Sequence, residues 1–207
     1  MRWIGCSAVS AAALALVVGC TSDTNDSTDS QGAPSTTAAT GANSQPHPPH
    51  PTLTAPSLQP PPQKNYGRPT VAFDPCTWIP DDVIAATGFD PVSRARSGDQ
   101  VAEVTFLNCD FKSKTRGLSV LSGNATWDED IQKNSAWSQP ITVNGREAMW
   151  VHDPNLARAC DIHLRTKVGF VDLGTTVTLA GVAQDVAPCD GLLDIATAIE
   201  PTIGKDN

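Results

Sequence analysis

The stretch from residue 160 to residue 170 reads CDIHLRTKVGF and alternates between two kinds of side chain. Every second position holds a residue suited to burial, namely Cys160, Ile162, Leu164, Thr166, Val168 and Phe170. Most of the intervening residues are polar. Successive side chains of a β-strand point to opposite faces of its sheet, so this pattern predicts a strand with one buried and one solvated face.

Other segments carry strand signals of the same kind. Asn144-Gly145 is a strong hairpin dipeptide because both residues tolerate a positive φ. We therefore expect an antiparallel sheet, whose further strands are residues 101–111, 118–121, 141–143, 146–151 and 175–182.

Helices are expected at both ends of this run of strands. Residues 79–88 have proline and two aspartates in the first turn and end on Gly88. In the last helix we expect Asp190 to be the N-cap and Pro201 the stop, with an apolar face made by Leu192, Ile195, Ala196 and Ile199. The sequence thus predicts an α+β domain, a single antiparallel sheet of about five or six strands with its N- and C-terminal helices packed on one face.

The N-terminus is typical of an exported lipoprotein. Residues 1–19 have one charge, Arg2, followed by a short apolar stretch, as in a signal peptide. Val17-Val18-Gly19-Cys20 fits a lipobox, which predicts cleavage before Cys20 and lipid on its sulfur. An ordinary secretory signal or an uncleaved anchor is the alternative. We expect the mature protein to lie on the outer face of the cytoplasmic membrane, held there by this lipid.

Residues 20–72 are rich in Ser, Thr and Pro and poor in large apolar side chains. Such a segment cannot offset the entropy of ordering its backbone, so we predict a disordered linker. The folded domain is expected to span residues 73–207.

The charge balance excludes one class of partner. The whole chain has 14 Lys and Arg, and loss of Arg2 with the signal leaves 13 against 22 Asp and Glu, a formal net charge of −9. Nucleic acid is therefore not an expected partner, because binding phosphates requires a concentrated basic face.

Four cysteines remain once Cys6 leaves with the signal and Cys20 is lipidated, and an even number in an exported chain indicates two disulfides. Three pairings are possible. The preferred one joins Cys76 to Cys109 and Cys160 to Cys189, because each bridge would then connect a helix start to a strand. A zinc site is the alternative, but the cysteines lack zinc-ligand spacing.

Catalytic motifs are missing from the sequence. There is no Gly-x-Ser-x-Gly turn, no phosphate loop and no calcium-loop spacing in Asp128-Glu129-Asp130. His152 and His163 are expected to lie on the surface, the latter on the polar side of its strand. We therefore expect a protein that is not an enzyme and that needs neither a metal nor a cofactor.

Tryptophan is unusually frequent for a chain with so few other aromatic residues. Trp78, Trp127, Trp137 and Trp150 are candidates for a groove that takes sugar, lipid or peptide. Burial in and around the core is the alternative, and we prefer it.

Several motifs together resemble a known family. The lipobox, the Thr/Pro-rich spacer, Phe73-Asp74-Pro75-Cys76, Cys109-Asp110, Cys160-Asp161 and the closing Pro188-Cys189 resemble actinobacterial lipoproteins of the unknown-function family 3558. The layout is more loosely similar to the extracellular sensor domains of mycobacterial receptor kinases. The resemblance implies an envelope lipoprotein with no known reaction.

Three functions remain open from the sequence. A non-enzymatic binding or accessory module that contacts an envelope protein or a cell-wall ligand is preferred. A carrier of a lipid or other apolar ligand is second, and an unrecognised enzyme is third.

If Cys20 is the lipidated residue, Cys20→Ser should abolish acylation and signal processing, because the serine hydroxyl does not accept the lipid. The separate domain should still form both disulfides. Mass spectrometry of intact protein from membranes checks both points. A variant that loses its disulfides as well would contradict the separation of anchor and fold.

Overall fold

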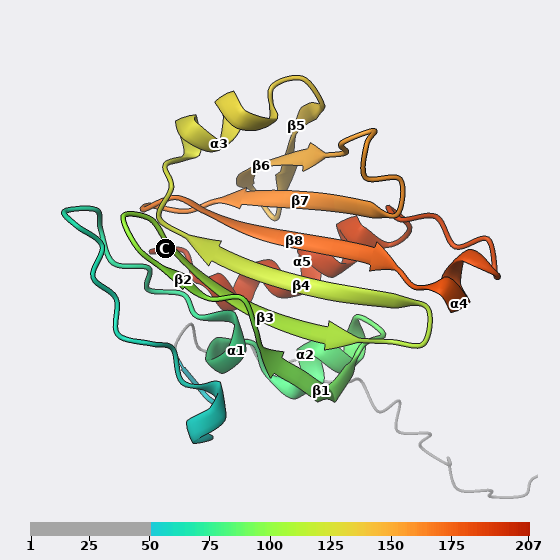
Figure 1. Ribbon diagram of the computed structural model, residues 1–207, viewed down its shortest axis with the longest axis horizontal. Helices are drawn as coiled ribbons and strands as arrows, with labels where there is room; N and C mark the ends of the chain where they lie inside the picture. Colours follow the sequence, from blue (N-terminus) through green and yellow to red (C-terminus); the bar gives the residue numbers. More distant parts are fainter. Residues whose placement is uncertain (1–50) are drawn as a thin grey trace, which may run out of the picture. The chain divides into compact units, whose positions relative to one another are not determined.

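The computed structural model describes residues 51–207, and their main feature is one eight-stranded antiparallel sheet (Figure 1). Its strand order is β1-β3-β4-β8-β7-β6-β5, with β2 paired to β3. The strands are β1 (Asp90–Arg96), β2 (Gln100–Val101), β3 (Thr105–Lys112), β4 (Arg116–Gly123), β5 (Ser138–Val143), β6 (Arg146–Val151), β7 (Ala159–Arg165) and β8 (Phe170–Val177). The predicted single antiparallel sheet is confirmed, but the predicted number of five or six strands is wrong. β1 is polar and interrupted by a bulge, so it has no clear alternation to detect.

Helices lie on both faces of the sheet. They are η1 (Pro56–Leu58), α1 (Pro75–Trp78), α2 (Asp81–Ala86), α3 (Trp127–Asn134), α4 (Leu179–Val182) and α5 (Leu192–Ile203). α1, α2 and α5 share the main hydrophobic core with one face, which we call the core face, and α5 runs behind β4 and β8 in Figure 1. α3 packs on part of the other face, the open face, through a small cluster around Trp127 and Phe170. No helix within residues 51–207 is long and apolar enough to span a membrane.

The predicted alternation holds along β7 only. Cys160, Ile162 and Leu164 are fully buried in the core face, whereas Asp161 and His163 belong to the open face. The predicted continuation to Phe170 is wrong, because the chain turns back after Arg165. A side chain at Gly169 would stand 2.3 Å from the Ala125 carbonyl oxygen, so this connection needs glycine.

The predicted strand 175–182 is also wrong in its second half. β8 ends at Val177, and the Thr178 hydroxyl accepts a hydrogen bond from the Gly181 N–H to begin the short helix α4. Thr178 is thus a helix cap rather than a strand residue, and side-chain capping of this kind competes with continued strand pairing.

The last helix differs from the prediction at both ends. Its N-cap is Gly191 in the left-handed region, since the Asp190 carboxylate accepts from the upstream Ala187 N–H. The helix continues through Pro201 to Ile203. Proline has no N–H for the Thr197 carbonyl, one turn earlier, but the Asn144 amide donates to that oxygen at 2.9 Å. A partner from another element therefore allows the helix to pass the proline.

Both disulfides have the preferred pairing. Cys76–Cys109 joins α1 to β3 with a Cα separation of 5.0 Å. Cys160–Cys189 joins β7 to the segment before α5, with Cα atoms 5.2 Å apart. Both disulfides lie on the core face, so they hold the terminal helices against the sheet.

The domain begins earlier than expected. Thr52 donates its backbone N–H to the Thr77 carbonyl, and Val71 is 3 % exposed. Arg96 anchors this segment through the Leu58 carbonyl and pairs with Asp74 at 2.6 Å. Residues 52–71 are therefore ordered against the domain, although most of them are exposed, because backbone and arginine hydrogen bonds replace the missing apolar side chains. The predicted signal peptide, Cys20 and the linker up to residue 50 lie outside the described residues.

The disulfide between β7 and the segment before α5 should contribute measurably to stability. Its cysteines are 29 residues apart. Replacing both Cys160 and Cys189 by Ser should lower the free energy of unfolding by about 3 to 4 kcal/mol, since the unfolded chain regains loop entropy. Urea denaturation followed by tryptophan fluorescence measures this. An unchanged midpoint would contradict a stabilising role.

Candidate functional site

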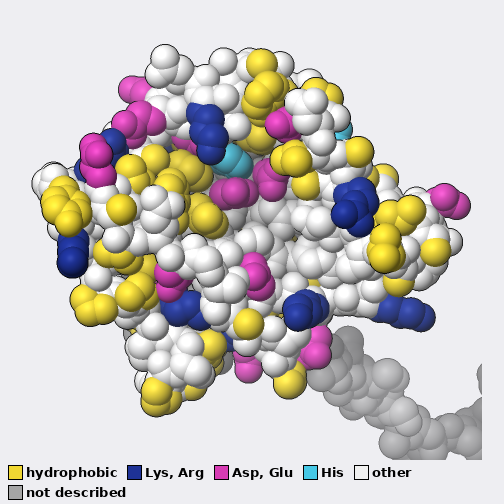
Figure 2. Space-filling view, in the orientation of Figure 1, with side chains coloured by type: hydrophobic (Ala, Val, Ile, Leu, Met, Phe, Trp, Pro, Cys, Tyr) yellow, Lys and Arg dark blue, Asp and Glu magenta, His cyan; other side chains and the backbone are white. Residues whose placement is uncertain are grey.

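The open face of the sheet contains a cavity of about 420 Å³, which we call the acidic pocket. Figure 2 shows a hollow near the middle of this face where acidic and histidine side chains meet between hydrophobic ones. Its residues come from β3, β4, α3, β6, β7, β8 and the segments next to them, and they are Phe106, Leu121, Asp130, Lys133, Asn134, Trp137, Val151, Asp153, Leu156, Asp161, His163, Phe170 and Asp172. The volume lies in the range of small-molecule sites.

His163 forms the floor of the acidic pocket. Its side chain is 9 % exposed, and its Nδ1 lies 2.7 Å from the Asp130 carboxylate on α3. Asn134, one turn later on α3, donates to the other Asp130 oxygen at 2.9 Å. The imidazole also stacks on Phe170, with ring centroids 5.2 Å apart. These contacts hold the ring in one orientation, with Nε2 3.5 Å from the Asp172 carboxylate.

α3 reaches this position because its start is well defined. Thr126 and Glu129 form a reciprocal capping box at its N-terminus. Arg68, from the N-terminal segment, makes two hydrogen bonds of 2.9 Å to the Glu129 carboxylate. The position of Asp130 thus depends on contacts with a remote part of the chain.

Two other carboxylates face the cavity without partners that satisfy them. The Asp161 side chain makes no hydrogen bond or ion pair to any residue of the described domain, and its only electrostatic neighbours are Asp172 and His163. The buried Oδ1 of Asp172 likewise accepts no hydrogen bond from the residues described. A buried acceptor such as Asp172 Oδ1 costs free energy unless a ligand or water supplies a donor, whereas the Asp161 side chain is half-buried.

The electrostatics follow from this crowding. Burial and the nearby Asp172 raise the pKa of Asp161 to about 7. Burial also raises the pKa of Asp172, against the opposing influence of His163. For His163 burial alone would lower the pKa, but Asp172 and Asp130 outweigh it and the pKa is raised. The raised pKa favours the positively charged form of the imidazole, while Asp161, with a pKa of about 7, is divided between both forms at neutral pH.

Gly174 provides the space that Asp161 occupies. It is the cross-strand neighbour of Asp161, and a Cβ there would lie 2.5 Å from Asp161 Oδ1 and 3.8 Å from Asp172 Oδ1. Both carboxylates thus lie close together over this glycine.

The residues proposed from sequence are distributed differently from the expectation. His163 is buried and not on the surface, because α3 covers its side of the sheet. His152 is exposed as predicted. The sequence did not identify Asp130, Asp161 and Asp172 as site residues, although Asp161 and His163 are two positions apart and therefore lie on the same side of their strand. Only recognition of the β7–β8 hairpin, which pairs His163 with Asp172, would have linked them.

The four tryptophans do not line one groove. Trp78 and Trp150 pack against the core-face cluster, and Trp127 and Trp137 belong to the open-face cluster. Trp127 donates to Glu147 at 2.9 Å, and only Trp137 lines the acidic pocket. Strand alternation separates them, since Trp150 points to the face opposite Met149 and Val151.

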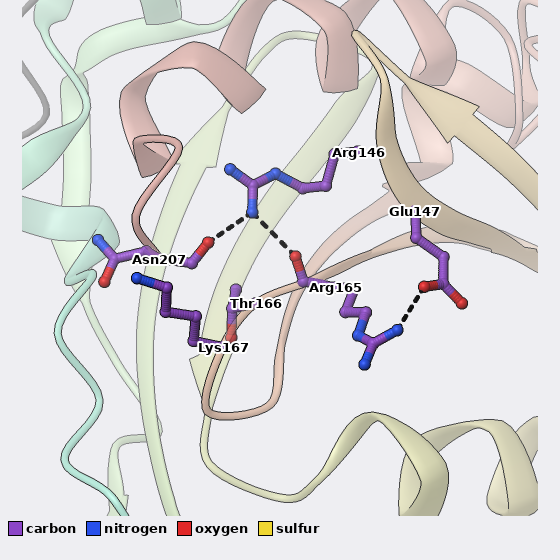
Figure 3. A pocket seen from close by; sticks show the side chains of 6 residues that line it. All are labelled: Arg146, Glu147, Arg165, Thr166, Lys167 and Asn207. Carbon is purple, nitrogen blue, oxygen red and sulfur yellow. Dashed lines mark hydrogen bonds and ion pairs between the residues drawn. The ribbon is translucent and has the colours of Figure 1, made fainter.

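Two other clusters have structural explanations. His152 Nδ1 lies 3.8 Å from Cys189 Sγ, but Cys189 is bonded to Cys160 and neither offers a thiolate to a metal. Figure 3 shows a basic pocket in which Arg146 donates to backbone oxygens of Arg165 and Asn207. Arg165 pairs with Glu147 at 2.6 Å. Both arginines already have partners. The Arg146 side chain also ties the C-terminal residues to the sheet.

The unsatisfied Asp161 should make the protein less stable as pH rises. An acid with a raised folded-state pKa gives no penalty below the unfolded value near pH 4 and a full penalty above about pH 7. Asp161→Asn should therefore raise the free energy of unfolding by on the order of 2 kcal/mol at pH 8 and change it little at pH 4. Urea unfolding at both pH values measures this, with Asp194→Asn on α5 as the control. An equal effect at both pH values would contradict the prediction.

Comparison with known proteins returns one match. The model of the family described as "Protein of unknown function (DUF3558)" matches residues 15–202, and no curated protein or solved structure is detectably similar. The matched region includes both disulfides and every residue of the acidic pocket. The chain belongs to the DUF3558 family of proteins of unknown function.

Proposed function

We propose that this chain is a non-enzymatic binding module of the cell envelope, held outside the cytoplasmic membrane by lipid on Cys20, and that the acidic pocket is its ligand site. The observation that carries the proposal is the pair of carboxylates, Asp161 and Asp172, that face the cavity with unmet hydrogen-bonding capacity. These carboxylates lower the stability of the folded domain, and their contacts within the domain do not offset that cost. Such an arrangement is typical of residues retained for binding.

The surroundings of these carboxylates also support a binding site. Phe106, Leu121 and Trp137 provide apolar walls, and a few polar groups converge between them. Small-molecule sites commonly combine mostly apolar walls with a small number of oriented polar groups. The ligand would be a small component of the envelope, or a short group that projects from a cell-wall polymer or another envelope protein.

The same residues make the lipid-carrier alternative less favourable. An acyl chain in this cavity would exclude water from Asp161 and Asp172 and donate no hydrogen bonds to them. Its binding would increase the penalty that the pocket already carries. A ligand with hydrogen-bond donors would reduce it.

Binding fits the pocket better than catalysis. No Ser, Thr or Cys lines the cavity, so it offers neither a hydroxyl nor a thiol nucleophile. The raised pKa of His163 favours its protonated imidazole, and the protonated form cannot act as a general base. The Asp130–His163 pair instead serves to orient the floor of the site.

The proposal predicts that filling the cavity abolishes ligand binding. Leu156 lines the pocket and is 53 % exposed, so Leu156→Trp should be tolerated while its ring enters the cavity. Leu193→Trp on α5 is the matched control, at a leucine that is 44 % exposed and outside the pocket. A thermal-shift screen of sugars, amino acids, short peptides and amines should find a class that stabilises wild type and the control but not Leu156→Trp.

The result decides the proposal in either direction. A compound class that stabilises all three proteins equally binds elsewhere and would count against the acidic pocket as the site. Absence of stabilisation throughout the screen would overturn the binding role as stated.

A further inference from the structure

We infer that the ligand of the acidic pocket is an organic cation, whose ammonium or guanidinium group lies between Asp161 and Asp172 while an apolar or planar body contacts Phe106 and Trp137. This inference rests on the proposed function and specifies the chemical class of the ligand. It is carried by the arrangement of charge, acceptors and walls around the cavity.

The charge of the cavity favours a cation. Four carboxylates line it, from Asp130, Asp153, Asp161 and Asp172, against two basic side chains, Lys133 and His163. Asp130 is engaged by His163 and Asn134, so it stabilises the floor and is not available to a ligand. Among the described residues the Asp161 carboxylate has no partner, and Asp172 Oδ1 has only the long contact of 3.5 Å from His163 Nε2. A cation between them would meet both an excess of negative charge and unused acceptors.

The two carboxylates lie close enough together for one donor group to reach both. They lie over Gly174, where a Cβ would stand 2.5 Å from Asp161 Oδ1 and 3.8 Å from Asp172 Oδ1. Both also line the acidic pocket, so an ammonium or guanidinium group in the cavity could contact Asp161 and Asp172 together. Any larger residue at position 174 would displace the Asp161 carboxylate from this place.

Other ligand classes fit less well. A neutral polyol would donate hydrogen bonds but add no positive charge beside the two crowded carboxylates. A Ca²⁺ or Mg²⁺ ion requires about six oxygen ligands, whereas much of the cavity wall is aromatic or aliphatic. For other metals, the one group of His, Cys, Asp or Glu side chains in residues 51–207 that is close enough to share an ion is His152, Cys160 and Cys189, outside this pocket. The aromatic side chains instead suit the body of an organic cation and can contribute cation–π attraction.

Binding should be linked to proton release. The groups that face Asp161 and its neighbours are Asp172 on β8, His163 on β7, Asp130 and Lys133 on α3, and Asp153 after β6. A cation favours the deprotonated form of Asp161, whose pKa is about 7 in the free protein. Loss of a proton from His163 or Asp172 would also favour binding of the cation, because it makes the cavity more negative. Affinity should therefore rise with pH, by about tenfold between pH 6 and pH 8 from Asp161 alone.

The test compares three probes of the same size and different charge, benzylammonium, benzyl alcohol and benzoate. The full mature chain is labelled with ¹⁵N-histidine in a non-ionic detergent, and the His163 signal is titrated. Benzylammonium should bind at least tenfold more tightly than benzyl alcohol, and benzoate should bind more weakly than either. The benzylammonium affinity should fall about tenfold from pH 8 to pH 6.

Substitutions assign the effect to the pocket. Asp161→Asn should weaken benzylammonium binding at least tenfold at pH 8 and remove most of its pH dependence. Asp194→Asn, an acid on α5 outside the pocket, should leave both unchanged. Equal binding of benzyl alcohol or benzoate would overturn the cation inference and leave the pocket as a ligand site. If none of the probes shifts His163, the inference also fails, and the Leu156→Trp screen decides separately on the proposed function.

Discussion

Side chains along β7 and β8 alternate between two environments, and the arrangement of the whole domain depends on this constraint. On one face Ile162, Leu164 and Leu173 are completely buried beneath α5 and the helices near the start of the domain. On the other face the same two strands present Asp161, His163 and Asp172. Successive side chains of a strand point to opposite faces of the sheet. Each residue that is buried in the core therefore places the next residue of its strand on the open face.

The two faces are stabilised differently. The core face combines apolar burial with both disulfides, so it can tolerate an unfavourable feature elsewhere in the domain. That feature is on the open face, where burial places Asp161 and Asp172 together without sufficient donors. By contrast, His163 and Asn134 together satisfy the neighbouring Asp130. The contrast between a closed, well-packed face and an open face with unmet polar groups is the main physical support for a binding role.

Long-range contacts determine where the pocket stands. Arg68 holds the start of α3 through Glu129, and α3 then places Asp130 against His163. The N-terminal segment that provides Arg68 has few apolar side chains, so composition suggested a linker. Its order comes from hydrogen bonds to distant residues, for example that between Arg96 and the Leu58 carbonyl. Composition does not reveal such partners, which explains the error in the domain boundary.

The sequence by itself determined the antiparallel sheet with helices and the main buried residues of β7, and among three possible pairings of the four cysteines it favoured the observed one. Alternation and the surroundings of each cysteine in the chain are local properties. Only the tertiary structure decided that the chain reverses after Arg165, that the last helix passes Pro201 with help from Asn144, and that the four tryptophans divide between two faces. It also brought Asp130, Asp161, His163 and Asp172 together. These outcomes depend on partners far apart in the chain, and strand register and helix packing, not local pattern, bring such partners within reach of each other.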